Sequence, residues 1–334
     1  MKTSYPHISS RIFPAVTILA AALFATPLPA TAQIPTFASG NGITVQSSAQ
    51  YPNGSRTVVI NIATPLISKK AIRVGSHQVW ITLPKDYSSA KSKRYPVLYL
   101  LHGGGDGWAG QWVSGGGKIE EITDGQDLIV VMPEGGKVGW YTDWVKQVGG
   151  EQKWESFHIN QLIPWIDANL RTDASRNGRA IAGLSMGGFG ALHYAFRHPD
   201  LFSYVGSFSG AADLQEPATQ LTIAEQSVVN GFLPNGAFGP VISGNWKVHN
   251  PLRNVEKFRG LNIAMYAGSG AHDLDVIERT MGFSTYRFHQ RLDERGIPNT
   301  FWMYGRPKGT TGCNGGHNWG CWSFALKDML PKMM

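Results

Sequence analysis

Short and longer apolar stretches alternate along this chain. The short ones are rich in Val, Ile, Leu and Ala, which is typical of strands buried on both faces of a parallel sheet. We predict strands at residues 95–101, 127–132, 178–184, 204–208, 261–267 and 299–304. The longer ones carry apolar residues at helical spacing, and we predict helices at residues 157–170, 187–196, 276–295 and 319–332. This alternation predicts an α/β fold, with a mostly parallel central sheet and helices on both faces.

Two regions near the start of the chain follow different patterns. Alternating apolar residues at Val74, Val79 and Ile81 indicate antiparallel strands at the start of the sheet. Residues 33–70 are polar and rich in Gly and Ser, with a β-like patch at 56–63, and we expect an N-terminal arm there.

Residues 211–260 combine scattered Gly and Pro with weak periodicity. We expect this stretch to be a cap inserted into a catalytic domain that spans residues 71–334. No internal repeat and no low-complexity tract divides the chain further.

The first 32 residues have the pattern of a secretory leader. Lys2 and Arg11 supply positive charge before an apolar run over residues 12–25. Ala30-Thr31-Ala32 then supplies a small-x-small cleavage site. The run is shorter than the roughly 20 residues that a membrane span needs. We therefore predict a secreted or cell-envelope protein without a transmembrane anchor; an uncleaved anchor is the alternative. Removing 32 of 334 residues leaves 302, enough for one large α/β domain.

Charge and cysteine content narrow the function classes. The net charge of +7 is spread along the chain, which does not indicate a nucleic-acid partner. Cys313 and Cys321, the two cysteines, flank His317, and export favours a disulfide between them. A zinc site built on Cys-x3-His-x3-Cys is the rival interpretation. It is weakened by the absence of a second nearby histidine.

The most informative motif is Gly-Leu-Ser-Met-Gly at residues 183–187, which reads G-x-S-x-G. It joins a predicted buried strand to a predicted helix, the context that a nucleophile elbow requires. We therefore predict that Ser185 is a nucleophile. A glycine-rich turn without chemistry is the alternative.

A serine nucleophile needs a base and an orienting acid, which follow it in the chain order Ser, acid, His in this type of fold. His317 lies after the last predicted strand in a glycine-rich loop and fits the base. Asp273 and Asp275 follow the strand at 261–267, and Glu278 lies one turn into the next helix. Position alone favours Asp273.

An oxyanion hole needs two backbone N–H groups. We expect one from Met186 and the other from Gly104, in a His-Gly-Gly-Gly run that directly follows the strand at 95–101. Substrate-lining residues are expected at the same edge of the sheet, with core packing as the alternative for the aromatic ones. The candidates are His102, Trp108, Trp144 and Trp319.

Several motifs together resemble a known family. They are Gly183–Gly190, Tyr141–Trp144, Lys153–Phe157, Asn250–Leu252 and His317–Trp319. In combination they resemble the secreted esterase D-like α/β-hydrolases, in particular the mycolyltransferases and their actinobacterial esterase relatives, over about residues 70–330.

The resemblance implies an acid ten positions before a helical phenylalanine. Glu278 lies ten positions before Phe288, so the resemblance favours Glu278 over Asp273 and Asp275. It also reveals a departure. The mycolyltransferases carry Asp-Gly-Leu-Arg where this chain has residues 102–105 as His-Gly-Gly-Gly, so the two side chains that help bind trehalose are missing.

These observations predict a serine esterase that cleaves carboxylic acyl esters through an acyl-enzyme. The expected partner is an acyl ester, with lipids and glycolipids among the candidates. No cofactor and no metal is expected, and no oligomeric state is predicted. The alternatives are an envelope acyltransferase that passes the acyl group to a sugar or glycerol alcohol, and a catalytically silent surface-binding protein.

Overall fold

The computed structural model describes Met1 and residues 34–52, 54–72, 77–105, 107–147, 149–270, 275–304 and 312–333. Apart from Met1, the predicted leader lies outside the described residues, and so do Val74 and Asp273.

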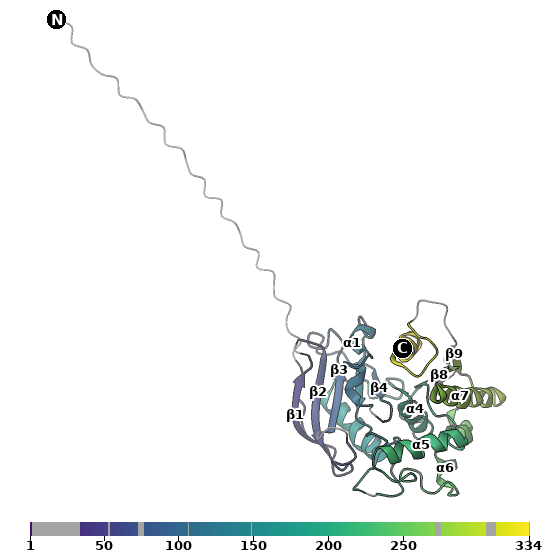
Figure 1. Ribbon diagram of the computed structural model, residues 1–334. Coiled ribbons are helices and arrows are strands. Elements are labelled where there is room, and N and C mark those ends of the chain that lie inside the picture. The colour runs from purple at the N-terminus through teal and green to yellow at the C-terminus, as the bar shows by residue number, and fades with distance from the viewer. Residues whose placement is uncertain are drawn as a thin grey trace. The chain divides into compact units, whose positions relative to one another are not determined.

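The described residues form one nine-stranded sheet with the order β1-β2-β3-β5-β4-β6-β7-β8-β9 (Figure 1). Its strands are β1 (Thr44–Gln50), β2 (Thr57–Ala63), β3 (His77–Thr82), β4 (Val97–Leu101), β5 (Ile129–Pro133), β6 (Arg179–Leu184), β7 (Tyr204–Phe208), β8 (Asn262–Gly268) and β9 (Thr300–Tyr304). The first four strands in this order pair antiparallel, and the remaining pairs are parallel. Since the ends of parallel strands meet at one edge, the loops after β4, β6, β7 and β8 are brought together.

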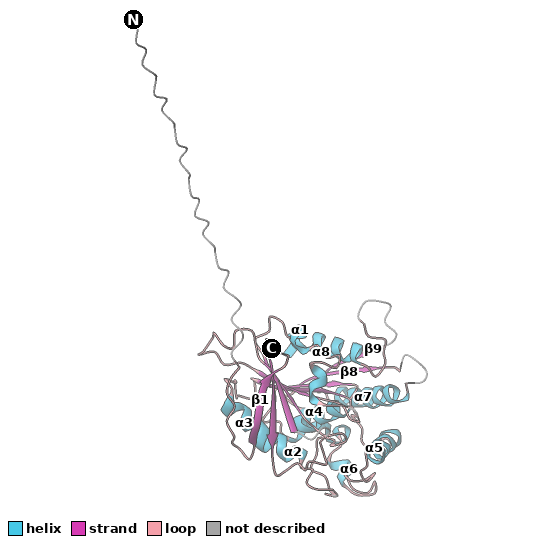
Figure 2. Cartoon of the chain, turned by 60° about the vertical axis from the view of Figure 1, so that its left-hand side comes forward, coloured by secondary structure: helices cyan, strands magenta, loops and turns pink. Residues whose placement is uncertain are grey.

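Helices cover both faces of the sheet (Figure 2). They are α1 (Ile119–Ile122), α2 (Trp154–Ser156), α3 (Ile163–Asn169), α4 (Met186–Arg197), α5 (Pro217–Val229), α6 (Asn245–Val248), α7 (Val276–Glu294) and α8 (Trp319–Met333). Two 3₁₀ segments, η1 (Ala109–Trp112) and η3 (Pro251–Phe258), and a π-helical segment, η2 (Phe157–Leu162), complete the set.

The core follows from the period-2 alternation of strand side chains. In β4, Leu98 and Leu100 belong to a cluster that includes residues of α8, such as Leu326. Val97 and Leu101 belong instead to the larger cluster on the opposite face, together with residues of α3 and α4. Burial on both faces explains why β4 is apolar at every position.

The predicted α/β-hydrolase architecture is confirmed by this sheet and its two helical layers. The region expected to be an N-terminal arm contributes β1 and β2 to the sheet. The region expected to be a cap, residues 211–260, contains α5, α6 and η3 between β7 and β8. Within the described residues, no helix combines the length and apolarity required to cross a membrane.

Candidate active site

Ser185 lies at the sharp turn between β6 and α4. Its backbone has φ 54° and ψ −119°, a conformation that non-glycine residues rarely adopt and that costs of order 1–3 kcal/mol. The Ser185 N–H donates to the Phe208 carbonyl over 2.8 Å, and the Phe189 N–H donates to the Ser185 carbonyl over 3.1 Å. These bonds hold the turn to the end of β7 and to the first turn of α4.

Both glycines of the G-x-S-x-G pattern are required by close backbone approaches. A Cβ atom at Gly183 would lie 2.4 Å from the Gly187 carbonyl oxygen. A Cβ atom at Gly187 would lie 2.6 Å from the carbonyl oxygens of Leu101 and His102. The pattern therefore packs the serine turn against the loop that follows β4.

Glu278 and His317 form a direct pair. Glu278 Oε2 lies 2.6 Å from His317 Nδ1, and the Glu278 side chain is fully buried. The other carboxylate oxygen, Oε1, accepts hydrogen bonds from Ser209 Oγ, over 2.9 Å, and from the Gly268 N–H. The carboxylate is thus fixed at the end of β8, and the Nε2 side of the imidazole is directed away from it.

Asp275, one of the alternative acids, has a different set of contacts. It is the N-cap of α7, and its Oδ1 accepts the Glu278 N–H over 2.9 Å. Its Oδ2 accepts the His317 N–H over 2.8 Å. The structure therefore brings Asp275 to the backbone of the pair, and not to the imidazole ring.

Sequence reasoning missed Ser209 and Trp322. Ser209 follows β7 with φ 50°, and its N–H donates to the Tyr266 carbonyl over 2.7 Å. Trp322 Nε1 donates to Ser209 Oγ over 3.1 Å, and the indole packs edge-on against the His317 ring at 4.9 Å. The available signal was position, because Ser209 directly follows β7, which lies between β6, the strand before Ser185, and β8, the strand before α7 and Glu278.

The loop after β4 is organised by His102. The Gly135 N–H donates to His102 Nε2 over 2.7 Å, so the ring hydrogen resides on Nδ1 and is donated to the Gly103 carbonyl, also over 2.7 Å. In a trans peptide the C=O and N–H groups point in opposite directions. Fixing the Gly103 carbonyl therefore sets the direction of the Gly104 N–H.

The two expected oxyanion donors lie on adjoining segments. A Cβ atom at Gly104 would lie 3.4 Å from Met186 Sδ, and one at Gly103 would lie 3.4 Å from Ser185 Cβ. Among the described residues, neither the Met186 nor the Gly104 N–H has a hydrogen-bond acceptor. Both groups are therefore available to a ligand oxygen.

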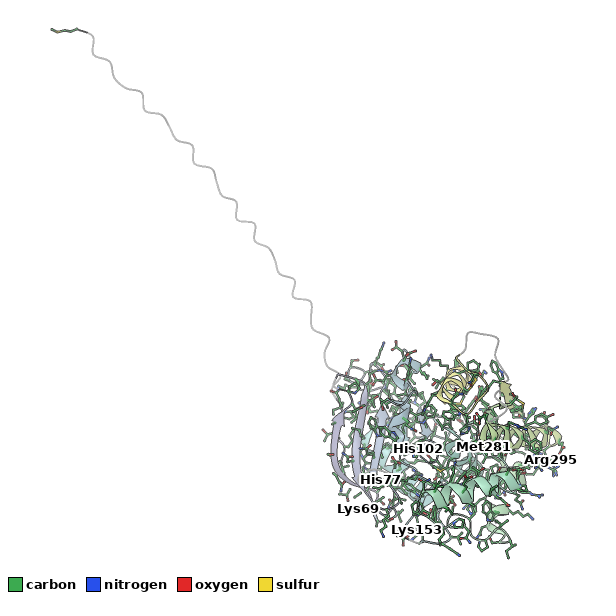
Figure 3. The ribbon with its side chains drawn as sticks, in the orientation of Figure 1. Lys69, His77, His102, Lys153, Met281 and Arg295 are labelled. Carbon is green, nitrogen blue, oxygen red and sulfur yellow. A yellow bond between two sulfur atoms is a disulfide. The ribbon has the colours of Figure 1, made fainter. Side chains whose placement is uncertain are left out.

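The four expected substrate-lining residues divide into two pairs. His102 and Trp144 are buried, and Trp144 Nε1 donates to the Gly139 carbonyl over 3.1 Å. Their side chains serve packing and loop geometry instead of forming an accessible lining (His102 is labelled in Figure 3). Trp108 and Trp319 are half-buried and pack edge-on against Trp80 and Trp112, respectively.

The predicted disulfide between Cys313 and Cys321 is present and closes the loop that carries His317. Both thiols are consumed, so these cysteines do not form the rival zinc site. Within the described part of the chain, one other group has metal-ligand character: Glu155, His193 and His249.

That group forms an internal network. Glu155 Oε1 accepts from Arg197 Nε over 2.6 Å and from His198 Nε2 over 2.8 Å. His193 Nε2 lies 2.8 Å from His249 Nδ1. Because these atoms already satisfy one another, we assign no metal to them.

Comparison with known proteins agrees with this geometry. The chain is 38% identical over 228 residues to Esterase Rv1288 of Mycobacterium tuberculosis. This match covers 66% of this chain and 49% of that protein. It is 32% identical over 254 residues to the diacylglycerol acyltransferase/mycolyltransferase Ag85B of Mycolicibacterium smegmatis, covering 71% of this chain and 76% of the relative. The chain thus spans about half the length of the esterase and most of the transferase.

Among solved structures, a ferulic acid esterase superposes with a TM-score of 0.58 at 25% identity, covering 83% of this chain and 98% of that one. Residues 75–333 match the sequence model of the Esterase family, described as putative esterase. Since this match extends over well more than half of the chain, the protein belongs to the Esterase family.

Proposed function

We propose that this protein is a secreted serine esterase that cleaves carboxylic acyl esters through an acyl-enzyme on Ser185. The observation that carries the proposal is the Glu278–His317 pair, 2.6 Å apart, at the sheet edge where Ser185 sits in a strained turn. One strand, β7, separates β6 from β8. With strands roughly 4.8 Å apart, the serine and acid strands are about 10 Å apart, a gap that an imidazole held by Glu278 can bridge.

In the proposed mechanism Ser185 Oγ attacks the ester carbonyl carbon while His317 Nε2 accepts the serine proton. Glu278 stabilises the imidazolium and keeps the ring hydrogen on Nδ1. The Met186 and Gly104 N–H groups bind the oxyanion of the tetrahedral intermediate. This intermediate collapses, and the alcohol leaves with the proton from His317. Water then attacks the acyl-enzyme by the same steps and releases the carboxylic acid and free Ser185.

Two observations support export. The first 32 residues have the composition of a secretory leader. The Cys313–Cys321 disulfide suits an oxidising compartment.

The relationship to Ag85B supports an acyltransferase as the second candidate, in which a sugar or glycerol alcohol replaces water. The loop after β4 favours hydrolysis. His102 is fully buried with both ring nitrogens engaged, and residues 103–105 have no side chains, so residues 102–105 offer no polar side chain to a sugar acceptor.

A direct test uses a series of p-nitrophenyl esters of increasing acyl length with the wild type, Ser185→Ala and Glu278→Gln. We expect Ser185→Ala to abolish turnover and labelling by a fluorophosphonate probe. Ser203→Ala, before β7 at the opposite end of the sheet, is the matched control and should retain both. Failure of the wild type to label would favour a silent surface-binding protein, and full activity of Glu278→Gln would exclude Glu278 as the acid.

The acceptor is tested separately with a labelled acyl ester in the presence of excess trehalose or glycerol. The proposal expects free acid as the main product. A predominance of acylated trehalose or glycerol would replace the esterase proposal with the transferase.

A further inference from the structure

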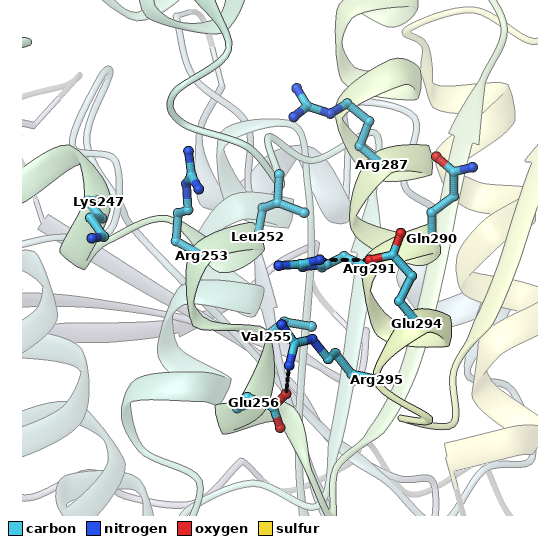
Figure 4. A pocket seen from close by; sticks show the side chains of 10 residues that line it. All are labelled: Lys247, Leu252, Arg253, Val255, Glu256, Arg287, Gln290, Arg291, Glu294 and Arg295. Atoms are coloured by element: carbon cyan, nitrogen blue, oxygen red, sulfur yellow. Dashed lines mark hydrogen bonds and ion pairs between the residues drawn. The ribbon is translucent and has the colours of Figure 1, made fainter.

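A basic groove lies between η3 and α7, with α6 at one end (Figure 4). Its volume is about 480 Å³, and its walls carry five cationic side chains but only two carboxylates. Leu252 and Val255 supply its apolar floor. A concave surface with an excess of positive charge concentrates anions.

The two carboxylates occupy one end of the groove. Arg291 Nη1 pairs with Glu294 Oε2 over 2.8 Å, and Arg295 Nη1 pairs with Glu256 Oε1 over 3.4 Å. Figure 4 shows both pairs as dashed lines at this end. These cations are therefore largely neutralised within the protein.

The other end has cations in excess. Arg287 pairs with the buried Asp213 over 3.0 Å. Arg253 Nε donates to the neutral Gln215 over 2.7 Å, and its Nη groups have no carboxylate among the described residues. Lys247 likewise has no carboxylate partner in the described part of the chain. Of the three cations at this end, Arg287 alone thus has a carboxylate partner among the described residues.

The arginines are also regularly spaced. Arg287 and Arg291 lie on α7 and Arg295 is its C-cap residue; at a spacing of four residues they form a row on one side of the helix with steps of about 6 Å. Guanidinium groups bind phosphate through paired N–H donors, and their weak hydration favours such contacts. Because Arg291 and Arg295 already pair with Glu294 and Glu256, Arg287 is the member of this row that, together with Lys247 and Arg253, supplies the excess positive charge for a ligand with more than one negative charge.

We propose that this groove is a binding site for a phosphate-bearing ligand, with a diphosphate or a lipid phosphate headgroup as the two sources of the group. The phosphate oxygens would contact Arg253, Arg287 and Lys247. The site lies away from the proposed ester centre, because Arg287 is nine residues beyond Glu278 on α7, or about 13 Å along the helix. The proposal is therefore independent of the esterase proposal.

The test is calorimetric titration of the folded protein with inorganic pyrophosphate, using wild type, Lys247→Gln/Arg253→Gln and Lys69→Gln/Lys70→Gln. All four substituted side chains are exposed, so both variants should fold. Lys69 lies on the opposite side of the catalytic domain from Arg295, and its pair with Lys70 removes the same charge at a distance (Figure 3). We expect saturable binding that weakens at least tenfold in the groove variant and stays unchanged in the control.

Equal losses of pyrophosphate affinity in the two variants would show a non-specific charge effect and overturn the proposal, as would the absence of saturable binding at millimolar pyrophosphate.

A second experiment measures sedimentation of the protein with phosphatidylglycerol or phosphatidylcholine vesicles. Selective binding to phosphatidylglycerol that pyrophosphate displaces would assign a lipid headgroup. Pyrophosphate binding without vesicle binding would assign a soluble ligand. Ester turnover should be the same in all three proteins.

Discussion

Asp275 and His317 are joined by a hydrogen bond of 2.8 Å from the histidine backbone N–H to Asp275 Oδ2. The second oxygen of the same carboxylate caps α7 through the Glu278 N–H, 2.9 Å away. One carboxylate therefore holds the proposed base by its backbone and the proposed acid by its helix. It sets the position of both partners without touching the imidazole ring.

This arrangement predicts different effects for the two acids. Asp275→Ala removes a helix cap, which typically costs about 1 kcal/mol of unfolding free energy, and releases the His317 backbone. We expect a decrease in kcat of roughly tenfold, whereas Glu278→Gln should lower kcat by about 10³-fold or more because the imidazolium loses its counter-charge. Steady-state kinetics and urea unfolding measure both effects. A larger kinetic loss for Asp275→Ala than for Glu278→Gln would contradict the assignment.

His102 is predicted to support catalysis through the backbone of Gly103 and Gly104. In His102→Leu the Gly103 carbonyl is no longer held, so the Gly104 N–H loses its orientation. We expect kcat to fall by about 10²-fold, the usual effect of losing one oxyanion donor, with KM changed only a few-fold. His102→Asn keeps a donor near the Nδ1 position and should recover part of kcat. If the two variants show the same kcat, the bond to Gly103 is not what matters.

The disulfide is predicted to stabilise both the fold and the His317 loop. Cys313 and Cys321 are eight positions apart, and closing so short a loop contributes roughly 2–3 kcal/mol in the chain-entropy model. Cys313→Ser/Cys321→Ser should unfold at lower urea concentration and show reduced kcat. Wild type treated with dithiothreitol should match the variant once thiol titration confirms reduction. Unchanged stability of the fully reduced protein would refute the prediction.

Acid lability is predicted from two buried histidines, His77 and His158. Burial lowers the pKa of His77 from 6.5 to about 4 and that of His158 from 6.5 to about 3. Below pH 6.5 the unfolded chain binds protons that the folded protein does not, so stability is fully present above pH 6.5 and is lost as the pH falls towards 4. Burial lowers the pKa of His193 and His249 in the same direction, and each proton taken up on unfolding adds about 1.4 kcal/mol per pH unit to the slope.

Urea unfolding between pH 7 and 5 measures this slope. His158→Gln should reduce it by about 1.4 kcal/mol per pH unit, whatever its effect on absolute stability, because one of these protons is then lost. Ser203→Ala removes no titratable group and is the control, which should leave the slope unchanged. A free energy of unfolding that stays constant over this range would contradict the prediction.

The sequence predicted the parallel half of the sheet well, because β4 to β8 are buried on both faces and are apolar at nearly every position, and the edge strand β9 keeps an apolar run although most of its residues are exposed. It did not predict β1, whose residues are mostly exposed and carry no hydrophobic alternation. It also did not predict α5, whose outer face exposes Leu221, Val228 and Val229, so that the helical period is obscured.

For the site, the G-x-S-x-G pattern located Ser185 because the turn itself demands small residues at 183 and 187. For the acid, position alone favoured Asp273, which lies outside the described residues, and only the family resemblance favoured Glu278 over Asp273 and Asp275. Ser209 left no motif, because its contribution arises from three-dimensional contacts with Glu278 and Trp322.

The segment between Phe208 and Asn262 leaves the sheet after β7 and returns at the neighbouring parallel strand, β8. Its length can therefore change without altering the register that separates β6 from β8. The fold is modular in this respect. Exchanging the part of the segment beyond Ser209 with that of a relative keeps the Ser209 contact with Glu278 and should leave Ser185, Glu278 and His317 at their spacing. Because a Cβ atom at Gly104 would lie 3.1 Å from Gln226 Oε1 of α5, this part borders the loop after β4, and we expect its exchange to change substrate choice.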